Sequence, residues 1–361
     1  MAQAATLRDV ARLAGVSTST VARVFHNKGY VAEETRRLVE ATIEETGYQL
    51  NAVAQGLRKQ RTLTLGHVLF SISPNPFFAG VALGIEQEAA ARGCGVLTSN
   101  TQGDPERERQ GVQTLIRRRV DAILFTTYAD AANVRLAAAA GIPVVQVERH
   151  AQIDTHTVTV DNYRGSFAAT EHVIAFGHRR IAYAGEPPGA REHSVGQRSG
   201  VVEQERVAGF FDAMNQQGLP VDDDLVDFSV QYSDSVRIRE VTRRWLALPA
   251  GQRPTAIFAT CDLLAAGVLQ EAYAHGLRVP EDLSVVGFDD TYGSHLTPPL
   301  TTVAQPMFEM GRCAAGIAID QVQLNVGAHG PGASAPTLLN ERLATRLVVR
   351  SSTGPVLEPA T

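Results

Sequence analysis

The sequence lacks the features that mark secreted, disulfide-bonded and membrane proteins. Its three cysteines, Cys94, Cys261 and Cys313, lie far apart and form no CxxC pair, so we expect neither a disulfide framework nor a zinc site. No run of about 18 apolar residues is present, as a membrane-spanning helix would need. The first ten residues, MAQAATLRDV, lack the basic-then-apolar pattern of a secretory signal. We therefore expect a cytoplasmic protein with no membrane partner.

Motifs of common enzyme classes are also missing. We find no P-loop, no GxGxxG after a strand, no GxSxG and no HExxH. The histidines are scattered, and His172 and His178 are six residues apart, so they do not share a helix face. We expect no catalytic residues, no cofactor and no metal.

Charge is distributed unevenly along the 361 residues, whose net charge is −5. Residues 1–61 contain nine Lys/Arg against six Asp/Glu, which leaves a net charge of −8 on the rest. A chain of this length predicts two or three domains. A small basic head on an acidic body indicates a polyanion partner for the head.

The head reads as three short helices, over about Leu7–Ala14, Thr18–Phe25 and Glu33–Thr46. Gly15 allows the turn between the first two, and Gly47 is a C-terminal stop. Ser17 is placed to cap the second helix. The pattern is typical of a helix–turn–helix, in which the second helix enters the major groove of DNA.

Within that second helix, Thr18 and Ser19 are compact enough to approach base edges or phosphates, and Arg23 can donate a bidentate pair to guanine. The alternative is a helical hairpin in which STST only caps a helix. The next segment, NAVAQGLRK from Asn51, is basic and too short to be a stable helix alone. Its Leu57 could wedge between base steps of a bound duplex, or the segment could be a plain linker.

From Leu63 onward, strand-like and helix-like segments alternate, which predicts parallel sheets with helices on both faces. The length is sufficient for two doubly wound lobes. The stretch 327–336 reads as a surface loop, and residues 351–361 as a frayed tail.

Several long stretches together resemble the LacI family of bacterial transcription regulators, in order from Thr6 to Ser352. They include TLRDVARLAGVSTSTVARVFHN, SPNPFFAGVALGIEQEAAARG, IPVVQVER, VDNYRGSFAATEHVIAFGHRRIAYAG, RVAGFFDAM, PTAIFATCDLLAAGVLQEAYAHGLRVPEDLSVVGFDD and LTPPLTTVAQP. The resemblance implies an all-α helix–turn–helix head (1–50), a hinge helix and linker (51–62), an α/β core (63–350) and a tail (351–361).

The same resemblance implies that the core has two Rossmann-like lobes of the periplasmic-binding-protein type. The N-terminal lobe would comprise about 63–161 plus 292–326, and the C-terminal lobe about 162–291 plus 327–350. The chain would cross between lobes near Asp161, near Asp290–Tyr292 and around 325–330.

Site residues follow from the resemblance, position by position. Those implied to contact DNA are Thr18, Ser19, Arg23, Asn51, Ala54 and Leu57. Those implied to contact a small effector in the cleft between the lobes are Asn75, Phe77, Phe78, Arg206, Tyr232 and Asp289. A carboxylate, a guanidinium and aromatic rings suit the hydroxyls and C–H face of a sugar. Taken alone, Asp289 could cap a turn, Arg206 could pair along a helix, and Tyr232 could pack in a loop.

The sequence departs from the family pattern at several places. Ala22 replaces a serine of the recognition helix, and Ala32 stands where a serine or threonine often caps the third helix. Cys261 occupies the position of an asparagine that bonds the effector. The segment 186–206 is long, and its Arg198 could supply a second cleft contact. These changes concern the effector rather than the fold.

The implied function is a repressor that binds a pseudo-palindromic operator in double-stranded DNA, as a homodimer or tetramer. A sugar-like effector would control DNA binding allosterically, with a purine or another metabolite as the alternative ligand. The competing function is a solute-binding protein of a transporter, which would need the cleft but not the head.

Overall fold

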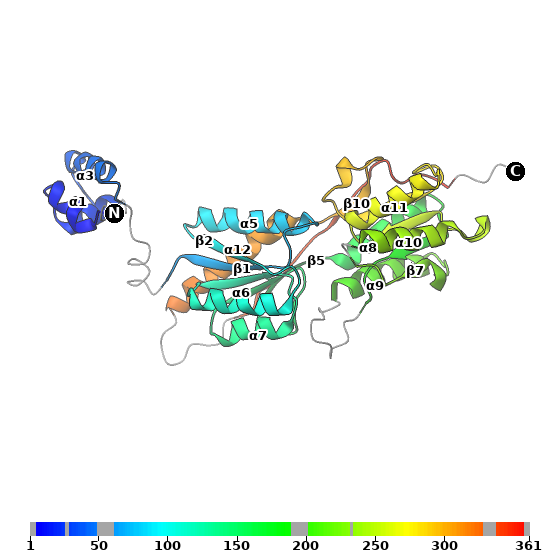
Figure 1. Cartoon of the computed structure of the whole chain (residues 1–361), viewed down its shortest axis with the longest axis horizontal. Helices are drawn as coiled ribbons and strands as arrows, with labels where there is room; N and C mark the ends of the chain where they lie inside the picture. The colour runs from blue at the N-terminus through cyan, green and yellow to red at the C-terminus, as the bar shows by residue number, and fades with distance from the viewer. Residues whose placement is uncertain are drawn as a thin grey trace. The chain divides into compact units, whose positions relative to one another are not determined.

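The protein is described by a computed structural model that covers residues 5–25, 29–48, 61–188, 201–231, 234–327 and 337–356. The chain forms two compact units, Met1–Thr62 and Leu63–Thr361. Figure 1 shows the helices and strands of each unit in chain order. The first unit is the helical head, and the second is the α/β core.

Three helices make up the head: α1 (Leu7–Leu13), α2 (Thr18–Phe25) and α3 (Glu33–Thr46). A capping box between Thr6 and Asp9 starts α1. Gly47 ends α3 in the left-handed conformation (φ +59°), as predicted. Ala32 precedes α3 without a side-chain capping bond, which is the consequence expected of an alanine there.

The first lobe of the core contains a six-stranded parallel sheet in the order β11-β5-β4-β3-β1-β2. Its strands are β1 (Thr64–Leu69), β2 (Gly95–Asn100), β3 (Ala122–Thr126), β4 (Val144–Val147), β5 (His156–Val160) and β11 (Asn340–Leu343). Its helices are α5 (Phe77–Ala91), α6 (Pro105–Arg117), α7 (Ala131–Ala139) and α12 (Met307–Gly327).

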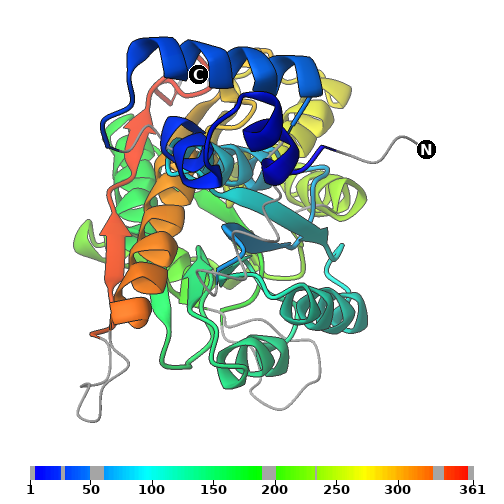
Figure 2. The same cartoon turned by 90° about the vertical axis from the view of Figure 1, so that its left-hand side faces the viewer.

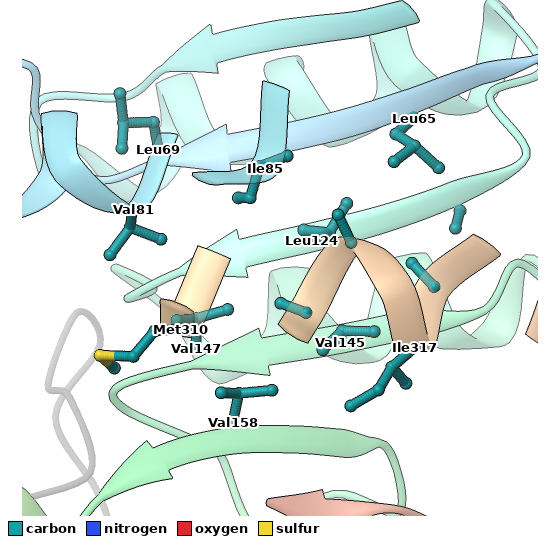
Figure 3. Packing of buried hydrophobic residues seen from close by; sticks show 14 of the residues in the cluster. Leu65, Leu69, Val81, Ile85, Leu124, Val145, Val147, Val158, Met310 and Ile317 are labelled. Atoms are coloured by element: carbon teal, nitrogen blue, oxygen red, sulfur yellow. The ribbon is translucent and has the colours of Figure 1, made fainter. Parts of the chain in front are cut away.

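Helices cover both faces of this sheet. Side chains alternate between the two faces along each strand, so neighbouring residues of one strand pack against different helices. Leu124 of β3 packs with α5 and α12, while its neighbours Ile123 and Phe125 pack with α6 and α7. Figure 2 shows α12 (orange) on the opposite side of the sheet from α6 and α7. Figure 3 shows how Val81, Ile85 and other apolar side chains fill the layer between α5, α12 and the strands. The central strands β1, β3 and β4 are buried on both faces, whereas the edge strands β2 and β11 are largely exposed.

Two glycines let α5 and α12 pack at close range. A Cβ on Gly84 would lie 2.0 Å from the Phe308 carbonyl oxygen, and one on Gly311 would lie 2.0 Å from the Val81 carbonyl oxygen. Any side chain at these positions would force the helices apart.

The second lobe repeats the architecture, with a sheet in the order β12-β10-β9-β8-β6-β7 in which only the β10–β12 pairing is antiparallel. Its strands are β6 (Ile181–Ala184), β7 (Val226–Asp227), β8 (Ala256–Ala259), β9 (Ser284–Asp289), β10 (Thr301–Ala304) and β12 (Arg346–Val348). Its α-helices are α8 (Asn162–Ala175), α9 (Val201–Gln216), α10 (Ser235–Leu246) and α11 (Asp262–Ala274), and short 3₁₀ turns lie at Asp223–Leu225, Ala250–Gln252 and Gly293–His295.

The chain changes lobes at places that differ in part from the prediction. It leaves the first sheet after β5, at Asp161. The predicted return near Asp290–Tyr292 is wrong, because β10 pairs with β9 in the second sheet and the return follows it. The predicted crossing at 325–330 is also wrong, because β11 pairs with β5 in the first sheet. The last crossing therefore lies between β11 and β12. Residues 292–304 thus belong to the second lobe, and residues 340–343 belong to the first.

The predicted tail begins too early. The Val285 backbone N–H donates to the Ser352 carbonyl (2.8 Å), and the Thr301 backbone N–H donates to Ser352 Oγ (2.8 Å). Ser352 is fully buried, and Gly354 O contacts His178 Nε2 at 3.0 Å. Residues 351–356 therefore belong to the second lobe, and residues 357–361 lie outside the described part of the chain. Across the described residues, no helix is both long and apolar enough to cross a membrane.

Candidate functional site

The head is built around a small apolar core that fixes α2 against α1 and α3. Val10, Val21, Val24 and Val39 are each at most 5% exposed and form one cluster. Gly15 makes the turn with φ +61°. This cluster holds α2 in place and leaves its opposite face in solvent.

The exposed face of α2 carries the three predicted base-reading residues, Thr18, Ser19 and Arg23. Ser17 caps the helix as predicted, since the Thr20 N–H donates to its Oγ (3.1 Å). Ser17 Oγ also lies 2.7 Å from Ser19 Oγ. Ser19 and Arg23 are four positions apart and so project from adjacent turns of one side of the helix. The arrangement can present two hydroxyls and a guanidinium to a groove edge.

Four predicted site residues lie outside the described part of the chain. They are Asn51, Ala54 and Leu57 of the proposed hinge, and Tyr232 of the cleft. Arg198 lies outside it as well. Their roles stay predictions.

In the core, the remaining predicted effector contacts converge on one cleft between the lobes. It is lined by Asn75, Phe77, Phe78, Glu148, Arg149, Tyr183, Glu186, Glu203, Arg206, Thr260, Cys261 and Asp289. Most of these residues follow the carboxyl ends of parallel strands, where loops from both sheets meet. The cavity volume is about 40 Å³, which is room for about three water molecules.

Asp289 ends β9 with φ +103° and is 3% exposed. Gln305 Nε2 donates to its Oδ1 (2.7 Å), and Asn75 Nδ2 donates to its Oδ2 (3.2 Å). Burial raises the pKa of Asp289 to about 7, and the nearby Arg206 guanidinium offsets this only in part. The carboxyl group is therefore poised to change its charge near neutral pH.

Arg206 projects from α9 and is held in place by three contacts. Its Nε donates to Asn162 Oδ1 (2.9 Å), its Nη1 donates to the Thr260 carbonyl (2.7 Å), and its Cζ lies 3.8 Å from the centre of the Phe288 ring. Its Nη2 is buried and has no hydrogen-bond partner among the described residues. Nη2 also lies 3.9 Å from Asp289 Oδ1. This leaves a fixed, buried donor available to an oxygen of a ligand.

The first lobe contributes polar and apolar groups to the same cleft. Asn75 Oδ1 accepts from the Phe77 N–H (3.0 Å), which fixes the start of α5. Phe77 and Phe78 are buried, with ring centres 5.5 Å apart in an edge-to-face arrangement. Such rings can pack on the C–H face of a sugar.

Sequence reasoning missed a cluster in which Arg149 lies among three glutamates. Arg149 follows β4 and bonds Glu203 of α9 through Nη1, at 2.5 Å to Oε1 and 2.6 Å to Oε2. Glu148 and Glu186 lie 3.9 Å from the same guanidinium. The available signal was the position of these residues: Glu148 and Arg149 follow one buried strand, and Glu186 follows another.

Asp262 is a further missed residue, and it positions the loop after Asp289. Its Oδ2 accepts from the Thr291 N–H (2.7 Å) and the Tyr292 N–H (3.1 Å), and its Oδ1 accepts from Thr302 Oγ1 (2.5 Å). Burial raises the pKa of Asp262 to about 6. Its neighbour Cys261 lines the cleft as predicted, and burial raises the pKa of the Cys261 thiol.

The described residues contain no group of three or more His, Cys, Asp and Glu side chains arranged to hold a metal ion. The cleft chemistry seen here is hydrogen bonding, charge and aromatic packing.

Known proteins resemble both units. A model for bacterial regulatory proteins of the lacI family matches residues 6–51, and a model for a periplasmic binding protein-like domain matches residues 170–353. The HTH-type transcriptional regulator DegA of Bacillus subtilis (strain 168) is 34% identical over 315 residues, covering 85% of this chain and 88% of that protein. The ribose operon repressor of Escherichia coli (strain K12) is 32% identical over 344 residues, covering 94% and 96%.

A solved structure extends the likeness to the whole architecture. The lac repressor dimer bound to operator and the anti-inducer ONPF matches with a TM-score of 0.78 and 26% identity, covering 98% of this chain and 100% of that chain. The predicted helix–turn–helix head and two-lobed α/β core are confirmed. The chain belongs to the LacI family of bacterial regulatory proteins.

Proposed function

We propose that this protein is a dimeric transcriptional repressor that binds operator DNA through its head and a small polyhydroxylated effector through the cleft of its core. It acts in the cytoplasm, where the operator DNA is. The observation that carries the proposal is a combination of two features in one chain. The exposed face of α2 carries Thr18, Ser19 and Arg23, and the cleft contains a buried donor, Arg206 Nη2, that has no hydrogen-bond partner among the described residues. The first suits a major groove, and the second suits a ligand oxygen.

On the DNA side, each head of the dimer reads one half of a pseudo-palindromic operator. The hinge around Asn51, Ala54 and Leu57 becomes helical on DNA, and Leu57 wedges into the minor groove. Basic residues of the head contact phosphates, so operator affinity falls steeply as salt rises.

On the effector side, the cleft must widen to admit a ligand. Its volume of about 40 Å³ is far below the roughly 300 Å³ of a typical small-molecule site. The Arg149–Glu203 pair joins a loop of the first lobe to a helix of the second, so it holds the cleft closed. A ligand that separates this pair changes the position of the lobes, and we expect a coupling to operator affinity of about 1–3 kcal/mol.

A solute-binding protein for a transporter would use the same cleft. That function leaves the DNA-type head without a role, whereas a repressor uses both units. Measured binding to DNA distinguishes the two functions.

The test measures operator binding of the full chain by gel shift, with DNA from its own promoter region, at 50 and 200 mM salt. Wild type should bind this DNA more tightly than a scrambled duplex, and Leu57→Ala should lose most of that preference. Leu38→Ala is the matched control, because Leu38 is 51% exposed on α3 and the same atoms are removed. A wild-type protein that shows no preference for promoter DNA contradicts the proposed function. If Leu57→Ala and wild type bind promoter DNA with equal affinity, the proposed role of Leu57 in the minor groove is contradicted, but the proposed function is not.

A further inference from the structure

Tyr183 has its ring in the core of the second lobe. It lies on β6, one residue before the end of the strand, and is 0% exposed. Its ring packs against the rings of Phe210, Phe228 and Phe258, at centre-to-centre distances of 5.0, 6.0 and 5.6 Å. These contacts fix the ring, and they therefore fix the position of its hydroxyl.

The hydroxyl of Tyr183 lies at the cleft and has no partner there. Tyr183 is one of the residues that line the cleft, and Arg206 and Glu203, whose charges act on its hydroxyl, line it too. The hydroxyl oxygen is buried and has no hydrogen-bond partner among the described residues. Burial raises the pKa of Tyr183, so the phenol keeps its proton and can both donate and accept a hydrogen bond.

The packing of the ring does not explain the hydroxyl. A phenylalanine would make the same ring contacts, whereas a buried hydroxyl without a partner costs free energy in the effector-free protein. A bound ligand that supplies a partner recovers this cost. Arg206 Nη2 is a second buried group of the same cleft without a hydrogen-bond partner among the described residues. Two such groups in one cleft indicate a ligand with at least two oxygen atoms to bond.

We propose that Tyr183 determines effector specificity, because its hydroxyl bonds one hydroxyl oxygen of a polyhydroxylated ligand while Arg206 Nη2 bonds another. This proposal rests on the proposed function, since it concerns the ligand of the same cleft. The phenol donates its proton to a lone pair of the ligand oxygen and can accept the proton of the ligand hydroxyl. A ligand without that oxygen leaves the Tyr183 hydroxyl buried without a partner, so the cleft rejects it.

The first measurement uses the wild-type full chain and sugars that differ by one oxygen atom. Calorimetry at pH 7 compares D-ribose with 2-deoxy-D-ribose, and D-glucose and D-galactose with their 2-deoxy, 3-deoxy and 6-deoxy analogues. At least one parent sugar should bind. One of its deoxy analogues should bind at least about tenfold more weakly, because it loses a hydrogen bond and leaves a buried hydroxyl without a partner.

The second measurement repeats the titrations with Tyr183→Phe. This variant should bind the parent sugar at least about tenfold more weakly than wild type. Its preference for the parent over that deoxy analogue should shrink to less than about threefold, because the variant and the analogue remove the two partners of one hydrogen bond. Tyr163→Phe is the matched control. The Tyr163 hydroxyl donates to Asp212 Oδ2 (3.0 Å), and neither residue lines the cleft, so this variant should bind sugars like wild type.

Melting temperatures of the effector-free proteins distinguish a binding role of the hydroxyl from a structural one. Tyr183→Phe keeps the ring and removes a buried group without a partner, so it should melt at the same temperature as wild type or higher. Tyr163→Phe removes a hydrogen bond and should melt no higher than wild type. A lower melting temperature of Tyr183→Phe would mean that the hydroxyl stabilises the fold, and it would overturn the inference.

The remaining outcomes separate the inference from the function on which it rests. The inference is overturned if no sugar of the panel binds, if no deoxy analogue binds more weakly than its parent, or if Tyr183→Phe keeps the affinity or the preference of wild type. Specific operator binding by wild type in any of these cases leaves the proposed function standing. Absence of specific operator binding contradicts the proposed function, whereas sugar binding that depends on Tyr183 still supports the inference about the cleft.

Discussion

Replacing Asp289 with Asn should remove most of the pH dependence that this buried carboxyl imposes on stability. Burial raises its pKa from 3.8 to about 7 in the folded protein. The folded state therefore holds a proton that the unfolded state loses from about pH 4 upward. Ionisation of Asp289 therefore lowers the free energy of unfolding increasingly as the pH rises from about 4 to 7, and the effect levels off above that.

The structure gives the size of this effect and indicates that the variant folds. With pKa values of 3.8 and about 7, linkage gives a loss of about 2.5 kcal/mol between pH 5 and 8. Asn75 Nδ2 and Gln305 Nε2 donate to the two carboxylate oxygens. Gln305 Oε1 has no partner among the described residues, so the Gln305 amide can rotate to accept from the new amide group.

The assay is urea unfolding of the effector-free protein at pH 5, 6, 7 and 8. The free energy of unfolding of Asp289→Asn relative to wild type should rise by about 2.5 kcal/mol across this range. Asp282→Asn serves as control: a hydrogen bond from Arg278 lowers the pKa of Asp282 to about 2, so it is ionised in both states above pH 5. Parallel curves for Asp289→Asn and wild type would refute the reasoning, because they would mean that Asp289 is ionised at little cost in the folded cleft.

Two further predictions concern packing and DNA reading. Gly311→Ala should lower the free energy of unfolding by about 1–3 kcal/mol, because its Cβ would lie 2.0 Å from the Val81 carbonyl oxygen. Gly316→Ala, on the same helix but with no neighbour closer than 3.6 Å, should be neutral or slightly stabilising. Thermal melts of the Gly311→Ala and Gly316→Ala variants check this prediction. An equal loss of stability in both variants would contradict it. Arg23→Ala should weaken specific operator binding by about 1–3 kcal/mol without changing the melting temperature, since Arg23 is exposed on α2. An unchanged preference for promoter over scrambled duplex in gel shifts would exclude base reading by Arg23.

Much of the fold could be predicted because its signals are local. Gly15 and Gly47 can adopt the left-handed conformation that the two turns require, because they have no Cβ, and Ser17 caps the helix that follows it. Alternation of apolar strands with helices predicted two doubly wound lobes, and both sheets are present. The residues that matched family positions in the described cleft, Arg206 and Asp289 among them, do line it.

The arrangement of the cleft could not be predicted in the same way. Arg149 and Glu203 are 54 residues apart and meet only because two lobes close on each other. Nothing local distinguishes them from an exposed ion pair. Tyr183 reads as an ordinary aromatic residue of a buried strand, and only the packing around it shows that its hydroxyl is left without a partner.

Helix starts, turns and the strand–helix order were determined by the sequence alone, since each depends on the conformational preferences of a few adjacent residues. The lobe crossings and the place of Ser352 were decided only in the tertiary structure. The hydrogen bonds of β11 reach residues more than 180 positions away in β5, and the bonds of Ser352 reach Val285 and Thr301. Pairing over such distances depends on how whole sheets assemble, which no short stretch of sequence encodes.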